Sequence, residues 1–418
     1  MTGIHLSPGL ANTVTALIEG VKAATPMVLL AGVTPATDLE HAQHINHVEL
    51  VTATGAGVVN LRGTDTVADD AIGITASAHL PVVIGGRGVD TPEAEAAGLR
   101  FAQRIEAPVA TSLRGKGLFA GDPFHLGVSG TVSHEVALDA IGKADCLVVF
   151  GASLNKYTSG HRGLTRGKRI VQVNPLASEI GRCTPVTVGL VGDPGLTADA
   201  MVKWLDEAEI PGSGARSEHL REQLQAWDAQ KRQKLMHKTP AGTVDLYEIA
   251  FALEEALPKA RVFLTDSGRF MFAFWNVLSV PNPHSYVDCN GFSSIGLGLA
   301  TAIGAARAAG ERPTLLVVGD GGFTLSGLSE LATAVDEKLD LVIVVPNDNM
   351  DPSLSLLPQR DFARIAEAFG ARGLTVTSSA ELQSAMQAIA TRDRKRPMVI
   401  DVKVDPASVY GGAPISRP

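Results

Sequence analysis

Asp320 and Asn347 each follow a run of branched apolar residues, at 314–318 and 339–345. Such runs are typical of strands that are buried on both faces of a sheet, and a helical pattern of apolar residues lies between them. A strand–helix–strand unit predicts parallel strands with a right-handed crossover. If the strands are neighbours, Asp320 and Asn347 meet at the carboxyl edge of the sheet, where open α/β sheets bind their ligands.

Together, the Asp320 and Asn347 side chains would offer one carboxylate and one amide oxygen as ligands. Such a hard, incomplete shell suits Mg²⁺ or Ca²⁺, with phosphate, water and a main-chain carbonyl supplying the remaining ligands. Gly321 and Gly322 follow Asp320 and let phosphate oxygens approach the backbone closely, and the next helix offers its N-terminus to the anion. The alternative is an ordinary glycine-rich turn with a buried Asp cap.

The Gly319-Asp320-Gly321 turn, with Asn347 at the end of the next strand, resembles the diphosphate-binding signature of thiamine diphosphate (ThDP) enzymes. Within this family, the sequence resembles the acetolactate synthase-like branch. The resemblance implies that the side chains of Asp320 and Asn347 and the main-chain oxygen of Asn349 bind Mg²⁺. It also implies that the turn, including Gly322, binds the cofactor diphosphate.

A second glycine- and serine-rich segment, at 290–298, opens a helix of small residues. It resembles the family segment that grips the pyrimidine and thiazolium rings, where small residues permit backbone contact with the cofactor. The resemblance implies cofactor contacts from Gly291, Ser293, Ser294 and Ile295, with Ile295 as the bulky residue that wedges the cofactor into a bent form. The alternative is simple packing of a helix on a sheet.

The first 70 residues resemble part of the family's pyrimidine-binding domain. Pro8 and Asn12 match its GPGxxN segment, with Ser7 replacing the first Gly, and Gln43 lies where the family often has a cofactor-proximal Gln. In relatives the Glu that activates the cofactor precedes this segment, so that Glu has no counterpart in the sequence and no catalytic residue is assigned. The segment between Asn347 and Asp361 is also shorter than the mobile lid of relatives.

Alternating strand and helix patterns predict an α/β protein with three doubly wound parallel-sheet domains, the first incomplete. The expected divisions are a partial pyrimidine-binding domain at 1–70, a central domain at 71–206, a charged helical linker at 207–241 and a diphosphate-binding domain at 242–418.

In acetolactate synthases the central domain holds FAD. Here Ser153 replaces the Arg expected after Gly151-Ala152, which argues against FAD without excluding it. The segment Gly85-Gly86-Arg87-Gly88 lacks a full GxGxxG pattern, and a tight turn is the favoured interpretation.

Composition excludes several classes of protein. The net charge of −8, without a dense basic cluster, argues against nucleic-acid binding. The 3 cysteines are far apart and include no CxxC, so neither a disulfide framework nor a zinc site is indicated. No long apolar run or secretory signal is present, so we expect a soluble, cytosolic protein without membrane contact.

By resemblance, the expected activity is ThDP- and Mg²⁺-dependent decarboxylation and carboligation of a 2-oxo acid such as pyruvate, in a homodimer or homotetramer. The alternative is a non-catalytic ThDP-binding or regulatory homologue, or the product of a truncated gene, that pairs with a full-length relative.

Overall fold

The computed structural model describes residues 2–4, 10–11, 13–15, 17–18, 29–31, 47–54, 64–291, 293–325, 328–348 and 360–405. The chain forms two compact units, Met1–Val67 with Leu176–Glu179, and Ala68–Pro175 with Ile180–Pro418. In the first unit, β1 (Thr2–Ile4) pairs in parallel with β2 (Leu29–Ala31), and α3 (His47–Thr52) follows. This parallel pair agrees with the sequence expectation for a fragment of a parallel sheet. Helix α4 (Thr64–Ala76) spans the boundary between the two units.

The second unit begins with a six-stranded parallel sheet in the order β5-β4-β3-β6-β7-β8. Its strands are β3 (Pro81–Gly85), β4 (Val109–Thr111), β5 (His125–Val128), β6 (Cys146–Phe150), β7 (Arg169–Asn174) and β8 (Val188–Val191). The direction of the strand order reverses between β3 and β6, as in doubly wound folds. Helices α5 (Pro92–Arg104) and α6 (Glu135–Lys143) connect strands of this sheet, and α7 (Pro194–Glu207) follows its last strand, β8.

The ends of these helices follow from local sequence. Thr91 precedes α5 and its side chain accepts a hydrogen bond from the Ala94 N–H at 3.1 Å. Asp193 caps α7 in the same way, and a proline follows each cap at the first helical position. Such caps satisfy N–H groups that the helix itself leaves unpaired, and proline loses nothing there because its missing N–H has no helical partner.

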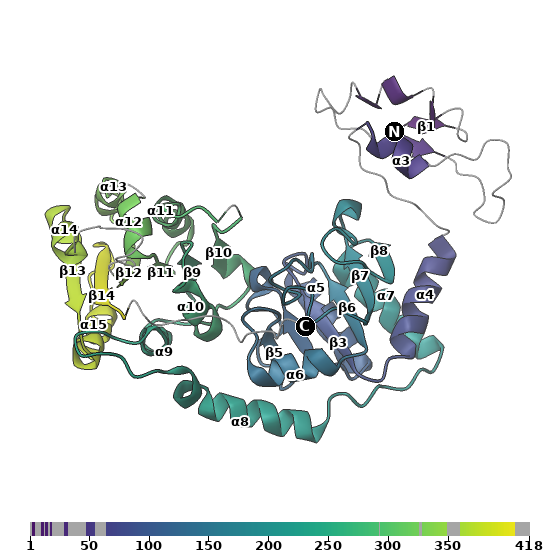
Figure 1. Cartoon of the computed structure of the whole chain (residues 1–418), viewed down its shortest axis with the longest axis horizontal. Coiled ribbons are helices and arrows are strands. Elements are labelled where there is room, and N and C mark those ends of the chain that lie inside the picture. Colours follow the sequence, from purple (N-terminus) through teal and green to yellow (C-terminus); the bar gives the residue numbers. More distant parts are fainter. Residues whose placement is uncertain are drawn as a thin grey trace. The chain divides into compact units, whose positions relative to one another are not determined.

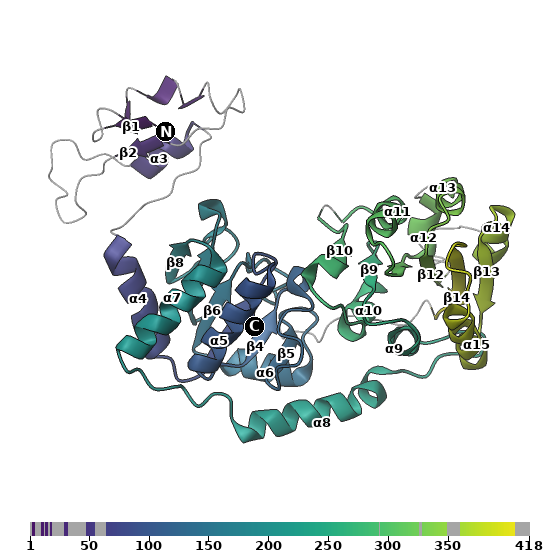
Figure 2. The same cartoon turned by 180° about the vertical axis from the view of Figure 1, so that it is seen from behind.

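A charged helix, α8 (Glu218–Leu235), follows the first sheet and matches the helix expected in the linker. Only Leu220 and Leu224 are buried among its residues. Figure 2 shows α8 beside α6, and the rings of His134 and Trp227 stack there with centroids 4.8 Å apart. The helix therefore covers the outside of the first sheet through few apolar contacts and one aromatic stack.

The second six-stranded parallel sheet has the order β10-β9-β11-β12-β14-β13. Its strands are β9 (Val262–Thr265), β10 (Tyr286–Asp288), β11 (Thr314–Val317), β12 (Leu341–Asn347), β13 (Arg372–Val376) and β14 (Met398–Lys403). The direction of the strand order reverses between β9 and β11, which is where ligands bind in open sheets.

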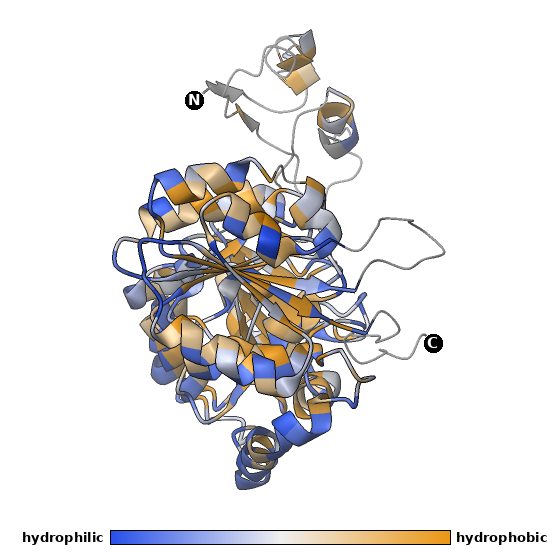
Figure 3. Ribbon diagram, turned by 90° about the vertical axis from the view of Figure 1, so that its left-hand side faces the viewer, coloured by the Kyte–Doolittle hydropathy of each residue, from blue (hydrophilic) through white to orange (hydrophobic). Residues whose placement is uncertain are grey.

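Helices cover both faces of the second sheet. Figure 1 shows α9 (Leu246–Ala256), α10 (Met271–Val277) and α15 (Ser379–Ala390) on one side, and α11 (Gly298–Ala308), α12 (Asp320–Leu325) and α13 (Glu330–Asp336) on the other, with α14 (Phe362–Ala368) near its edge. Leu315 packs in the core with α9 and Leu316 packs in the core with α11, because successive strand residues face opposite sides. In Figure 3 the strands are apolar and lie between helices with more hydrophilic outer faces. The predicted doubly wound architecture is thus confirmed for both sheets.

Candidate active site

Asp320 follows β11, and Asn347 is the last residue of the adjacent parallel strand β12. Strand β11 pairs with β12 from Thr314↔Leu341 to Val317↔Val344. Asp320 follows Val317, and Asn347 follows Val344, by the same number of residues. The equal spacing brings both side chains to the carboxyl edge of the sheet.

The connection between these strands differs from the expected single helix. Asp320 is itself the first residue of α12 (Asp320–Leu325), and a separate helix, α13 (Glu330–Asp336), follows. The Asp320 carbonyl oxygen accepts the Thr324 hydroxyl at 2.8 Å, within the first turn of α12. Leu328 lies in a turn before α13 and packs against the same core cluster as Leu331 and Val335.

Asp320 lies in an acidic, partly buried environment. Burial, together with the nearby carboxylates of Asp348 and Asp401, raises the pKa of its carboxyl group to about 6. The Gly321 N–H, which donates to Asp320 Oδ1 at 2.7 Å, and the Lys403 ammonium oppose this shift. A divalent cation at this position would favour the ionised carboxylate and screen the repulsion among the three acidic side chains.

Asn347 is almost fully buried, with 1% of its surface exposed. Its Nδ2 donates to Asp401 Oδ1 at 2.9 Å and approaches the Arg360 carbonyl oxygen at 3.4 Å. Asp401 lies on β14, next to β12, and is fully buried. The sequence reasoning assigned no role to Asp401, although an acidic residue inside the apolar run 398–404 was a usable signal.

Asp266 is a second buried acidic residue that the sequence reasoning left without a role. It directly follows β9, and its Oδ2 accepts the Gly296 N–H at 2.8 Å. Burial raises the pKa of Asp266. Its Oδ1 is buried and, among the described residues, has no hydrogen-bond partner. This unpaired acceptor lies where the two glycine-rich segments meet, because Gly298 and Gly322 both pack directly against Asp266.

The segment before α11 carries the predicted ring-binding residues on its surface. Gly291 and Ser293 are exposed, Ser294 is half-buried, and Ser293 has a positive φ of 60°. Ile295 is 40% exposed and Leu297 46% exposed. Simple helix–sheet packing would bury these two large apolar side chains, so the packing alternative does not account for this part of the segment.

Four predicted site residues lie outside the described residues. They are Asn349, expected to bind the metal through its main-chain oxygen, and Pro8, Asn12 and Gln43. Among the described residues, no group of three or more His, Cys, Asp or Glu side chains could hold a metal ion. A metal ion held by Asp320 and Asn347 would therefore need further ligands from main-chain, water or cofactor oxygens.

Glycines at the carboxyl edge of the first sheet serve tight backbone packing. The Gly86 N–H donates to the Phe150 carbonyl at 2.8 Å, and the Gly88 N–H donates to the Gly151 carbonyl at 3.0 Å. A methyl group on Gly88 would come within 2.7 Å of Gly151 Cα. These N–H groups are therefore engaged within the protein, as expected for a tight turn.

Two family models match the chain. Residues 68–201 match the thiamine pyrophosphate enzyme central domain, and residues 266–351 and 350–402 match the thiamine pyrophosphate enzyme C-terminal TPP binding domain. The chain belongs to the thiamine pyrophosphate (thiamine diphosphate) enzyme family. Its C-terminal match contains Asp266, Asp320, Asn347 and Asp401.

The sequence identity between the chain and individual relatives is low. The chain is 23% identical over 371 residues to a probable acetolactate synthase large subunit of Methanococcus aeolicus, covering 82% of this chain and 61% of that protein. It is 26% identical over 344 residues to the putative thiamine pyrophosphate-containing protein YdaP of Bacillus subtilis, covering 78% of this chain and 57% of that protein. A sulfoacetaldehyde acetyltransferase of Alcaligenes xylosoxydans xylosoxydans is 25% identical over 356 residues, covering 76% and 59%. The match thus spans about three fifths of these relatives. None of the described helices is long and apolar enough to cross a membrane.

Proposed function

We propose that the protein is a ThDP- and Mg²⁺-dependent enzyme that decarboxylates a 2-oxo acid such as pyruvate and joins the remaining carbon unit to an acceptor. The observation that carries this proposal is the placement of Asp320 and Asn347 at the carboxyl ends of two adjacent parallel strands of the second sheet. The names of the relatives include acetolactate synthase and acetyltransferase, which supports transfer of a carbon unit as the reaction class.

The residues present fit the metal and the cofactor diphosphate. Asp320 and Asn347 would bind Mg²⁺ through side-chain oxygens, and Asn349 through its main-chain oxygen. Hard oxygen ligands suit this ion. Burial and the nearby carboxylates raise the pKa of Asp320 to about 6, and a bound cation would stabilise its ionised form. Bound ThDP would supply the carbon nucleophile and the electron sink for cleavage next to the 2-oxo group.

The segment before α11 would support the rings of the cofactor. The backbone at Gly296 is held by Asp266, so the turn keeps a fixed position beside the diphosphate site. Ile295, with 40% of its surface exposed, would contact the cofactor between its two rings. Together the Asp266 carboxylate and the glycine turns would orient the cofactor before substrate arrives.

We propose further that the enzyme is a homo-oligomer, a dimer or tetramer. Three large apolar side chains, Ile295, Leu297 and Leu325, are 40%, 46% and 65% exposed in the described part of the C-terminal domain. Exposed apolar residues around a polar site favour coverage by another protein surface. Light scattering on the purified full chain tests this point, and a monomer at all concentrations would contradict it.

Calorimetric titration tests cofactor binding. ThDP should bind in the presence of Mg²⁺ and lose most of its affinity in excess EDTA. Asp320→Ala should lose ThDP affinity at least 10-fold, because the metal loses its only carboxylate ligand among the assigned residues. Unchanged affinity in Asp320→Ala would overturn the metal assignment.

Release of CO₂ from pyruvate and from longer 2-oxo acids tests turnover. Detectable release that requires both Mg²⁺ and ThDP supports the enzymatic function. Tight, Mg²⁺-dependent ThDP binding without turnover of any 2-oxo acid would contradict it and leave a non-catalytic ThDP-binding role.

A further inference from the structure

The orientation of the Asn347 side chain is fixed by the groups around its amide. The Asp401 carboxylate lies 2.9 Å, and the Arg360 carbonyl oxygen 3.4 Å, from the same end of the amide. A carbonyl oxygen and a carboxylate both accept hydrogen bonds, so the end that faces them must be the NH₂ group. The amide oxygen of Asn347 is thereby turned away from Asp401.

Asp401 is itself held firmly in place. Strand β14 pairs with β12 so that Asp401 lies opposite Val345 and Lys403 lies opposite Asn347. The second carboxylate oxygen, Oδ2, accepts the Phe362 N–H at 3.1 Å and the Lys403 ammonium at 2.9 Å. Phe362 begins α14, so one buried carboxylate joins two strands and a helix N-terminus. Both oxygens of Asp401 are thus occupied by donors, and its position leaves Asn347 a single favourable orientation.

We propose that Asp401 is a positioning residue of the metal site, which holds the Asn347 amide with its oxygen toward Mg²⁺. This inference rests on the proposed function. Partners of metal ligands that fix the orientation of the ligand commonly contribute 10- to 100-fold to metal affinity. The competing interpretation is that Asp401 only joins β14 to α14 and that Asn347 would find the metal without it.

The first variant is Asp401→Asn, which keeps the shape of the side chain. Asparagine offers one acceptor and one donor, while Phe362 N–H and Lys403 both require an acceptor. The new oxygen should therefore face Phe362 and Lys403, and the new NH₂ group should face Asn347. Asn347 must then rotate and present its own NH₂ group to the metal. We expect Mn²⁺ affinity in the presence of ThDP, measured by electron paramagnetic resonance, to fall about 10- to 100-fold.

The second background is Asn347→Asp, because a carboxylate needs no particular rotation to bind a cation. In that background the native Asp401 faces another carboxylate, whereas the amide introduced by Asp401→Asn donates a hydrogen bond to it. Asp401→Asn should therefore leave Mn²⁺ affinity unchanged or increase it in the Asn347→Asp protein. The effect of Asp401→Asn on Mn²⁺ affinity should thus differ in sign between the two backgrounds. This double-mutant cycle separates a role in orienting Asn347 from a general loss of stability.

A purely structural role for Asp401 predicts a different pattern. Asp401→Asn would then lower Mn²⁺ affinity by the same factor in both backgrounds, in proportion to a lower melting temperature. That pattern, or wild-type affinity in Asp401→Asn, overturns the inference.

The proposed function is tested separately, by measuring Mn²⁺ binding to the wild-type protein and to Asp320→Ala. If the wild type binds no Mn²⁺ with ThDP, the proposed function and this inference are both overturned. If the wild type binds, Asp320→Ala does not, and Asp401→Asn binds as the wild type does, the proposed function stands and the role of Asp401 is overturned.

Discussion

Gly322 packs so closely against Asp266 that a methyl group in its place would overlap the Asp266 carboxylate. The two residues belong to different segments, one in α12 and the other directly after β9. Their contact joins the turn that would bind the metal to the segment that would hold the cofactor rings, since Asp266 also accepts the Gly296 N–H.

Gly322→Ala should therefore force Asp266 or α12 to move. We expect a loss of about 1–3 kcal/mol in the free energy of unfolding, as is usual for overpacking, together with weaker ThDP binding. Chemical denaturation and ThDP titration are the measurements. Gly304→Ala in α11 is the matched control, because nothing lies within 4 Å of the added methyl group; there the helix should gain about 0.5–1 kcal/mol. Equal stability of the two variants would contradict the prediction.

The raised pKa of Asp320, about 6, makes the metal-free protein sensitive to pH. An unfolded Asp has a pKa near 3.9, so the folded protein holds this proton more tightly than the unfolded chain does. The contribution of Asp320 to stability is therefore fully present below pH ~3.9 and is lost as the pH rises through about 6.

Asp320→Asn removes this ionisation. Without metal, the variant should melt at a higher temperature than the wild type at pH 7.5, and the difference should vanish near pH 4. Thermal unfolding in EDTA across this pH range is the measurement. A wild type that melts higher than the variant at pH 7.5 in EDTA would count against the acidic environment described for Asp320.

The stack of His134 on Trp227 should respond to pH in the opposite direction. Burial, together with the nearby His125, lowers the pKa of His134 to about 4, although Asp228 opposes the shift. Neutral His134 also accepts the Ala137 N–H through Nδ1 at 3.3 Å and so caps α6. Its stabilising contribution is present above the unfolded pKa of about 6.5 and is lost as pH falls toward 4.

Amide hydrogen exchange of α8, expressed as protection factors, should show less protection at pH 5 than at pH 7. His134→Asn keeps a good capping side chain and cannot titrate, so protection of α8 should be lower at pH 7 and change little with pH. Identical pH dependence in the variant and the wild type would assign the effect to other groups.

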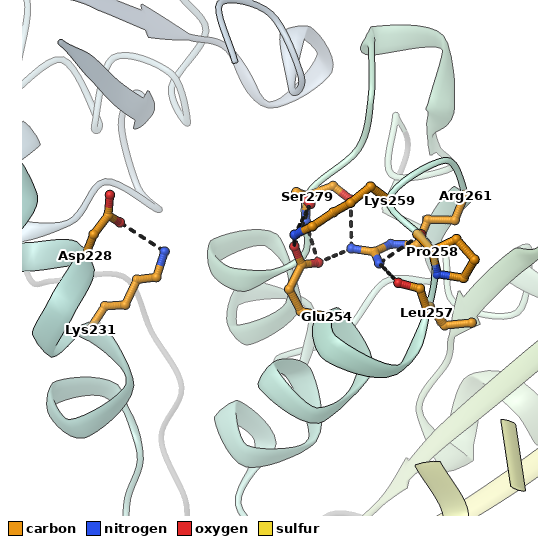
Figure 4. Close-up of polar contacts among 8 residues, drawn as sticks. All are labelled: Asp228, Lys231, Glu254, Leu257, Pro258, Lys259, Arg261 and Ser279. Carbon is orange, nitrogen blue, oxygen red and sulfur yellow. Dashed lines mark hydrogen bonds and ion pairs between the residues drawn. The ribbon is translucent and has the colours of Figure 1, made fainter. Parts of the chain in front are cut away.

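An ion-pair cluster lies at the amino end of β9, away from the candidate site at the carboxyl edge of the sheet (Figure 4). We expect this cluster to contribute to folding stability and not to ThDP binding. Arg261 is fully buried directly before β9 and pairs with Glu254. The same guanidinium donates to the carbonyl oxygens of Leu257 at 3.1 Å and Ser279 at 2.9 Å. The Lys259 ammonium also pairs with Glu254, and hydrogen bonds from Lys259 and Ser279 together with the Arg261 charge lower the Glu254 pKa despite its burial.

Arg261→Met should cost about 3–5 kcal/mol of unfolding free energy, because it removes the main partner of a mostly buried carboxylate. Arg100→Met is the control, since Arg100 and Asp199 are 54% and 49% exposed and an exposed pair contributes about 0–1 kcal/mol. Denaturant titration measures both. The folded fraction of Arg261→Met should bind ThDP as the wild type does, because the cluster lies at the amino end of the sheet; a selective loss of ThDP affinity would be inconsistent with this assignment.

The parallel arrangement of β11 and β12 could be predicted because it depends on local information. Both strands are continuous apolar runs, and a helix-length connection requires parallel strands. The same information placed Asp320 and Asn347 at one edge. It did not separate α12 from α13, because apolar spacing through Leu328 continues across the turn between them.

The partners of the site residues depend on contacts across long sequence distances. Asp401 lies 54 positions from Asn347, and Asp266 lies 30 positions from Gly296. Only the order of strands in the sheet, β9-β11-β12-β14, makes these residues neighbours. A pattern that reports periodicity within one element carries no information about which strand lies beside it.

The shared register of β11 and β12 has a consequence for insertions and deletions. Side chains alternate between the two faces of a strand, so removing one residue from β12 before Asn347 would turn its side chain away from Asp320. The connection at 337–340, between α13 and β12, is not part of a strand, so a change in its length does not alter which face of the sheet a β12 side chain occupies. Changes of chain length that preserve the site should therefore accumulate in that connection. The number of residues from Val317 to Asp320, and from Val344 to Asn347, should stay fixed.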